Sequence, residues 1–290
     1  MISTLSNGNI TIEVNSIGAE LWSIKKANDS FEYLWQGDGT YWTGRSPVLF
    51  PNVGAVKNNV MRVDGKEYPL GNHGFPRKLE FELKVKSDSV LTYIYTYNDE
   101  SLQMYPFKFT LELSYTLIDT TVTIDYKVTN LDNQAIYFQL GTHAGFNCPM
   151  AEGLSFDDYY LEFDTSEKSR RLYFDAANLL VSNKDSEGLD GTKYPLSFDL
   201  FTEGACIFKH IHSSKITLKS DQNSRQVTLG FNKFPYLGIW QKQGAPYVCI
   251  EPWYGISDAD DYTGEFKDKE MIIALEEKNA YDCQLTITVE

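Results

Sequence analysis

Four short segments hold the residues that could do chemistry, and each interrupts an otherwise strand-like pattern. They cover residues 44–54, 71–77, 141–147 and 249–255. Between them they contain an arginine, Arg45, two histidines in glycine-containing loops, His73 and His143, and one carboxylate, Glu251. Two imidazoles and a carboxylate that meet in one cleft are the equipment for acid–base catalysis without a metal or a nucleophile.

Glu251 is the candidate base. It follows the apolar run 247–250 and precedes a proline and two aromatic residues, so we expect it to end a buried strand. A carboxylate in that setting is partly desolvated, which raises its pKa toward the range that suits a general base. The alternative is a rim carboxylate that accepts backbone hydrogen bonds.

The two loop histidines each have a structural alternative. His143 follows the predicted strand 135–140, and a side chain at a strand end can reach into a cleft. The glycines around His73 indicate either a close approach of the backbone or a simple turn. His210 and His212 alternate along residues 209–213 like residues at a strand edge, and we do not expect them to be catalytic.

The elements that must position these residues are strands. Period-two alternation places apolar side chains on one face of residues 10–14, 111–117, 122–128 and 285–289. Less regular runs cover residues 79–86, 90–97, 135–140, 215–219, 226–231 and 247–250. This pattern predicts an all-β fold of antiparallel sheets packed face to face, formed by one domain over residues 1–290. Residues 182–192 read as a surface loop, and residues 269–278 fit either a helix or a strand.

The net charge and the cysteine pattern limit which partners and which cellular compartment we expect. Twenty-six Lys and Arg against 40 Asp and Glu give a net charge of −14, which disfavours nucleic acid and anionic membranes. The four cysteines form no C-x-x-C pair, and no leader or membrane-spanning run is visible. We therefore expect a cytoplasmic protein with reduced thiols, no metal site and no cofactor.

The four segments occur in the order and spacing of the galactose mutarotase-like, or aldose 1-epimerase, family, and the chain resembles its LacX-type branch. The resemblance implies an antiparallel β-supersandwich with its active site in a cleft. It also implies that His143 is the general acid, Glu251 the base, His73 a second cleft histidine, and Arg45 a ligand for substrate oxygens. The activity implied is interconversion of the α and β anomers of a hexose by ring opening, in a monomer or homodimer.

Other cleft residues are expected to bind the sugar: Asn72, Arg77 and Asn147 through hydrogen bonds, and Trp240 and Trp253 through their aromatic faces. One departure concerns an aspartate that the family usually carries in the last third. Gly204 stands at the matching position, and Glu203 is the residue that could replace it. We further expect a bell-shaped pH profile, its acid limb set by Glu251 and its alkaline limb by His143.

Two alternatives stay open. Arg45 and Arg77 could clamp a phosphate, which would make the substrate a hexose 6-phosphate. The chain could also be a carbohydrate-binding protein of the same fold without activity. A glycoside hydrolase should show two carboxylates facing one cleft, and only Glu251 stands out by its context.

Overall fold

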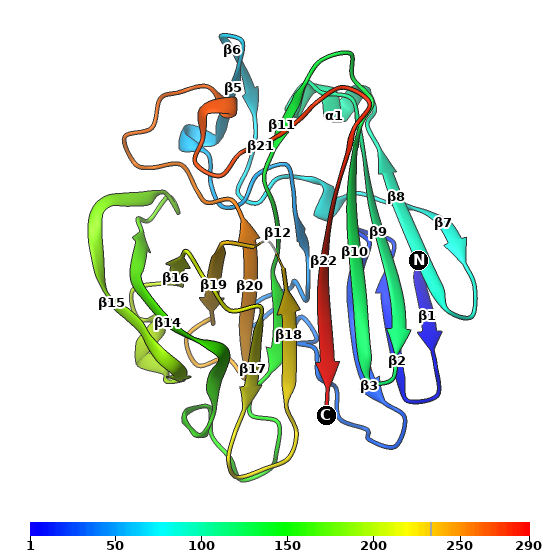
Figure 1. The fold of residues 1–290 in the computed structure, drawn as a ribbon, viewed down its shortest axis with the longest axis vertical. Coiled ribbons are helices and arrows are strands. Elements are labelled where there is room, and N and C mark those ends of the chain that lie inside the picture. The colour runs from blue at the N-terminus through cyan, green and yellow to red at the C-terminus, as the bar shows by residue number, and fades with distance from the viewer. Residues whose placement is uncertain (233) are drawn as a thin grey trace.

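Antiparallel strands form almost all of the regular structure in the computed structural model, which describes residues 1–232 and 234–290 (Figure 1). The largest sheet runs in the order β4 (Val48–Leu49), β12 (Leu140–Thr142), β20 (Tyr247–Tyr254), β19 (Tyr236–Trp240), β16 (Cys206–Lys209), β14 (Tyr160–Phe174), β17 (Lys215–Lys219), β18 (Val227–Phe231), β22 (Ala280–Val289), β10 (Thr121–Asn130), β9 (Phe109–Ile118), β8 (Val90–Thr96) and β7 (Glu82–Lys86). In addition, β13 (Ala144–Asn147) pairs with β20, and β15 (Leu180–Pro195) pairs with β14.

Smaller elements complete the fold. Three short sheets contain β1 (Ile2–Ser6), β2 (Ile10–Asn15) and β3 (Glu20–Lys26); β5 (Val60–Val63) and β6 (Lys66–Pro69); and β11 (Ile136–Phe138) and β21 (Ile273–Leu275). One α-helix, α1 (Asp99–Met104), begins where Asn98 and Ser101 form a capping box. Single 3₁₀ turns cover Lys57–Asn59, Pro76–Lys78, Phe156–Asp158, Phe198–Phe201 and Phe266–Asp268. Among the described residues, no helix combines the length and apolar character that crossing a membrane requires.

The alternation of the strands explains how the layers form. β2 and β9 bury every second side chain, as the sequence pattern predicted. The β1–β3 sheet packs behind β8, β9 and β10 (Figure 1). There the Tyr93 hydroxyl donates to the Val14 carbonyl and the Tyr115 hydroxyl to the Ala19 carbonyl. The predicted class, an all-β fold of packed antiparallel sheets, is confirmed.

One predicted loop is wrong. Residues 182–192 lie within β15, which pairs with β14 through several register shifts. Because β15 is an exposed edge strand, its polar side chains face water on both sides and leave no alternation to read. In the ambiguous stretch 269–278, only Ile273–Leu275 is regular, and it is a strand.

Candidate active site

Two catalytic candidates, His143 and Glu251, lie side by side at the large sheet, and the third, His73, comes from the loop between β6 and the turn at Pro76–Lys78. Glu251 lies inside β20, opposite Gly238 of β19, so the prediction that it ends a strand is wrong. On the other side of β20, the pairs Gly141–Trp253 and Ala144–Ile250 flank the short break between β12 and β13. The same register sets His143 directly beside Glu251, which makes an imidazole and a carboxylate from distant segments a cross-strand pair.

Glycines beside Glu251 make room for the Trp253 indole. A Cβ atom at Gly141 would lie 2.8 Å from Trp253 Cδ1, and one at Gly238 would lie 2.9 Å from Trp253 Cζ2. The indole therefore extends over both neighbouring strands and occupies the space where their side chains would stand. This explains why glycine is required at both strand positions.

His143 and Glu251 meet in a buried environment. The distance from His143 Nε2 to Glu251 Oε2 is 3.3 Å, and their side chains are 11% and 2% exposed. The Trp42 ring lies against the His143 ring with 4.7 Å between centroids, and Trp240 approaches it edge-on at 5.6 Å. These aromatic walls hold the imidazole at the carboxylate and keep bulk water from one side of the pair.

Burial shifts the two pKa values in opposite directions. Desolvation raises the pKa of Glu251 well above its usual value, and the neighbouring Trp253 indole N–H offsets part of this rise. Desolvation, helped by the positive charge of Arg77, lowers the pKa of His143 to about 3. Each shift disfavours the charged form of its group, so both shifts favour a neutral carboxyl group beside a neutral imidazole.

His73 is held as a neutral hydrogen-bond donor. The backbone N–H of Gly54 donates to the ring nitrogen Nδ1 of His73 at 3.0 Å. The backbone N–H of His73 donates in turn to the Gly54 carbonyl at 2.9 Å. Because Nδ1 accepts, the proton of the neutral ring sits on Nε2. Desolvation, together with the charges of His143 and Arg77, lowers the pKa of His73 well below its usual value.

The loop that carries His73 depends on one glycine. Gly74 has a φ of +68°, and a Cβ atom there would lie 1.8 Å from the Phe50 carbonyl oxygen. Asn52 reinforces the same junction by donating to the carbonyls of Gly54 and Gly71. The first two segments singled out in the sequence therefore form one rigid unit that fixes His73.

These groups surround a cavity of about 560 Å³, within the range of about 300–1,000 Å³ typical of small-molecule sites. Seven of the predicted site residues line it: Asn72, His73, Arg77, His143, Trp240, Glu251 and Trp253. Asn72 Oδ1, Arg77 Nε and Glu251 Oε2 are buried there without a well-aligned hydrogen bond from the described part of the chain. Buried polar atoms of this kind are costly unless a ligand or water satisfies them, so a ligand rich in hydroxyl groups suits the cavity.

Two predicted ligands lie elsewhere. The Arg45 guanidinium stacks on the Trp22 ring at 3.8 Å and donates to the Trp22 carbonyl and the Gln36 side chain. Asn147 donates to the carbonyls of residues 32 and 34 and so ties β13 to that segment. Neither residue lines the cavity that holds the other seven, so the geometry does not bring them to a common ligand.

Comparison with known proteins gives the family. The model of the aldose 1-epimerase family matches residues 1–274. The chain belongs to the aldose 1-epimerase family. A LacX protein of Lactococcus lactis subsp. lactis is 33% identical over 282 residues, which cover 94% of each chain. The recognition based on the four segments is therefore confirmed.

Solved structures agree with this family. The galactose mutarotase related enzyme of Lactobacillus acidophilus is 32% identical, with a TM-score of 0.95 over 100% of this chain and 97% of the other. A galactose mutarotase-like protein of Lactobacillus casei is 31% identical, with a TM-score of 0.94 over the whole of both chains. The predicted galactose mutarotase-like fold is thus confirmed.

In this member of the aldose 1-epimerase family, some residues of the cavity wall were not predicted from the sequence. Glu203 and Gly204, at the position where the resemblance implies an aspartate, line the cavity, and Glu203 pairs with Lys184. Seven further lining residues outside the four segments were not predicted, because none stands in a motif or beside a glycine-flanked histidine: Trp42, Phe174, Asp175, Ala176, Asn178, Ala205 and Ser257. Asp175 and Asn178 come from the turn between β14 and β15, the hairpin that was taken in part for a loop.

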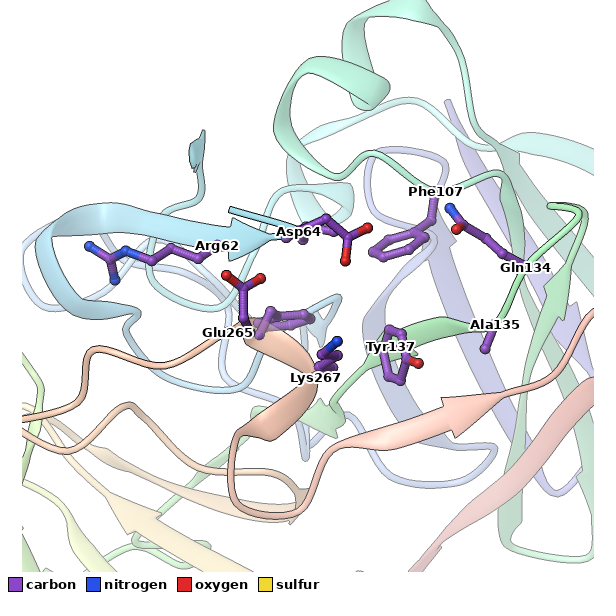
Figure 2. A pocket seen from close by; sticks show the side chains of 10 residues that line it. Arg62, Asp64, Phe107, Gln134, Ala135, Tyr137, Glu265 and Lys267 are labelled. Carbon is purple, nitrogen blue, oxygen red and sulfur yellow. The ribbon is translucent and has the colours of Figure 1, made fainter. Parts of the chain in front are cut away.

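A second cavity does not suit a sugar. It lies between the β5–β6 hairpin, the segment before β11 and the turn at Phe266–Asp268 (Figure 2). Figure 2 shows charges of both signs on its wall, from Arg62, Asp64, Glu265 and Lys267. Its volume of about 120 Å³ is below the size of most ligand sites.

Within the described residues, one group of side chains beside the large cavity could hold a metal ion. Ligand atoms of His143, Cys249 and Glu251 lie within 4.8 Å of one another, and all three residues are buried. Two of them, His143 and Glu251, are the residues predicted from the sequence to exchange protons with a substrate. A metal bound there would compete with that exchange.

Proposed function

We propose that this chain is an aldose 1-epimerase that interconverts the α and β anomers of a hexose, with Glu251 and His143 as its acid–base pair. The observation that supports this most strongly is their 3.3 Å contact at the wall of the large cavity. Both pKa shifts favour a pair that holds a single exchangeable proton, which is the number that ring opening requires. A carbohydrate-binding protein without activity would have no use for such a costly buried pair.

The reaction needs two proton transfers. Glu251 takes the proton of the C1 hydroxyl, the oxygen's electron pair forms the C1 carbonyl, and the bond between C1 and the ring oxygen breaks. His143 gives its proton to the ring oxygen. Rotation about C1–C2 then presents the other carbonyl face, and the same transfers in reverse close the ring. Each transfer by a positioned group contributes about 10²–10⁴-fold.

The remaining cavity residues hold the sugar for these transfers. His73 Nε2 and Arg77 donate hydrogen bonds to its oxygens, and Asn72 Oδ1 accepts one. The faces of Trp42, Trp240 and Trp253 pack against the apolar C–H face of the ring. The direct test is anomer exchange, followed by polarimetry or saturation-transfer NMR over a panel of free and phosphorylated aldoses. Exchange no faster than in buffer for every sugar would overturn the proposal.

The activity should not depend on a metal. We expect exchange to proceed at its full rate after exhaustive treatment with EDTA, because Glu251 and His143 supply both transfers themselves. The measurement compares rates before and after chelation and after adding back divalent ions. Loss of activity in EDTA with recovery on adding one ion would refute this mechanism.

A hexose 6-phosphate is a second candidate substrate. The observation that favours it is the position of Arg77 in the cavity wall. Arg77 is the one arginine or lysine among the described residues that line the cavity. Its Nη2 donates to the Asn72 carbonyl at 3.1 Å, whereas its Nε points to no protein acceptor in the described chain. A guanidinium with free donors can clamp a phosphate.

Replacing Arg77 distinguishes the two substrates. If Arg77 binds phosphate, Arg77→Ala should lower kcat/KM for a hexose 6-phosphate at least about tenfold more than for the free sugar, because a charge-assisted contact is lost. Arg45→Ala is the matched control, since Arg45 lies outside the cavity. Equal losses for both sugars in Arg77→Ala would remove the phosphate candidate.

A further inference from the structure

Cys249 has no part in the ring-opening chemistry, yet it sits beside the residues that do. It lies two positions before Glu251 on β20, so both side chains are on the same face of the strand. Its cross-strand neighbours are Gly145 on one side and Trp240 on the other. Because Gly145 lacks a side chain, no Cβ atom occupies the position 3.4 Å from the Cys249 sulfur.

Three different donor atoms gather at this point, where Cys249 also belongs to a core cluster with Trp35, Ala245 and Tyr247. His143 Nε2 and Glu251 Oε2 are 3.3 Å apart, close to the roughly 3.4 Å between nitrogen and oxygen ligands on a tetrahedral zinc ion. The Cys249 sulfur lies within 4.8 Å of a ring nitrogen of His143 and a carboxylate oxygen of Glu251, so side-chain rotations could bring all three onto one ion. Glu251 is 2% exposed, and its Oε2 receives no well-aligned hydrogen bond from the described residues.

We propose that His143, Cys249 and Glu251 form a zinc-binding site that inhibits the enzyme. An imidazole, a thiolate and a carboxylate are the three ligand types that zinc takes, and the fourth position would face the cavity. Thiolate selects zinc over magnesium or calcium, which bind through oxygen ligands. The bound ion occupies the nitrogen and the oxygen that must exchange protons with the sugar, so it blocks both transfers. The inhibition, though not the binding, rests on the proposed epimerase function.

The test uses zinc itself and two cysteine positions. Wild type, Cys249→Ala, Cys249→Ser and the control Cys148→Ala are freed of metal and titrated with Zn²⁺ against a chromophoric chelator. Cys148 is as fully buried as Cys249 but does not belong to the group of possible metal ligands. Anomer exchange is measured on the same samples. We expect one zinc per chain and loss of exchange in wild type and Cys148→Ala.

In the Cys249 variants we expect exchange at the wild-type rate and zinc binding at least about 100-fold weaker, since loss of a direct ligand should exceed the effects seen for supporting residues. Wild-type zinc affinity in Cys249→Ala or Cys249→Ser would overturn the site. So would a wild-type protein that takes up no zinc. If both variants fail to fold, Co²⁺ decides the question in wild type: a thiolate-to-cobalt charge-transfer band supports the site, and its absence refutes it. The chelator titration needs no turnover, so a chain that binds zinc through Cys249 but shows no epimerase activity would contradict only the proposed function.

Discussion

Glu251→Gln and His143→Asn should each lower kcat for anomer exchange by about 10²-fold or more while the fold stays intact. Glutamine keeps the size of Glu251 but cannot accept the anomeric proton, and asparagine keeps a polar group at position 143 but cannot donate to the ring oxygen at neutral pH. General acid–base catalysis typically contributes about 10²–10⁴-fold for each group. The measurement is exchange at saturating sugar, with circular dichroism as the check on folding.

The double variant tests whether the two residues act as a unit. Ring opening needs both transfers, so removing the second group after the first costs little more. The combined loss should be much smaller than the product of the two single losses. A combined loss equal to that product would mean that the two groups act independently.

The chain offers a matched control pair. His212 Nδ1 lies 3.4 Å from Glu167 Oε2, a contact of nearly the same length as that of the proposed catalytic pair. Neither His212 nor Glu167 lines the cavity that holds His143 and Glu251, and the His212 side chain is 70% exposed. His212→Asn should therefore keep wild-type turnover. Near-wild-type turnover in His143→Asn or Glu251→Gln would instead remove that residue from the mechanism and make His73 the next candidate.

Much of the sheet structure could be predicted because alternation survives wherever one strand face is buried. Residues 111–117 and 122–128 became β9 and β10 for this reason. Prediction from hydrophobic alternation fails at β15, because both faces of this edge strand are largely exposed to solvent and its side chains do not alternate between apolar and polar. The position of Glu251 inside β20 was missed for a related reason. The proline and aromatics after it read as the end of a strand, yet all three continue it.

The site was predicted from local context, and its geometry was not. His73, His143 and Glu251 were found because glycines or buried strands surround unusual side chains. The pairing of His143 with Glu251 depends on the register of strands more than one hundred residues apart, which no local pattern encodes. Trp42 was missed although its ring lies against His143. Arg45 shows the opposite failure, since its sequence context does not reveal the Trp22 ring on which it stacks.

The pH profile of kcat/KM should be bell-shaped, with its limbs assigned in the reverse of the order expected from the sequence. Ordinary pKa values would have placed a carboxylate on the acid limb and a histidine on the alkaline limb. Burial reverses this order, because it lowers the pKa of His143 to about 3 and raises that of Glu251. As the pH falls through the lower value, a second proton binds and the pair can no longer accept one. As the pH rises through the raised value of Glu251, the last proton leaves and no acid remains.

The active form is the pair with one proton, whichever residue holds it. The two pKa shifts favour the proton on Glu251 in the free enzyme, and its transfer to His143 Nε2 would create the carboxylate base and imidazolium acid that ring opening uses. Both arrangements contain the same number of protons, so they share the same two limbs. Activity should fall about tenfold per pH unit outside the plateau.

Arg77→Ala decides which residue sets which limb. The positive charge of Arg77 helps to lower the pKa of His143, whereas Arg77 is not among the causes of the shift at Glu251. Removing that charge raises the pKa of His143, so the acid limb should move to higher pH while the alkaline limb stays in place. The measurement is kcat/KM for a free sugar in wild type and Arg77→Ala, over the pH range in which circular dichroism shows both folded. Movement of the alkaline limb alone would return that limb to His143, and the sequence-based assignment would then stand.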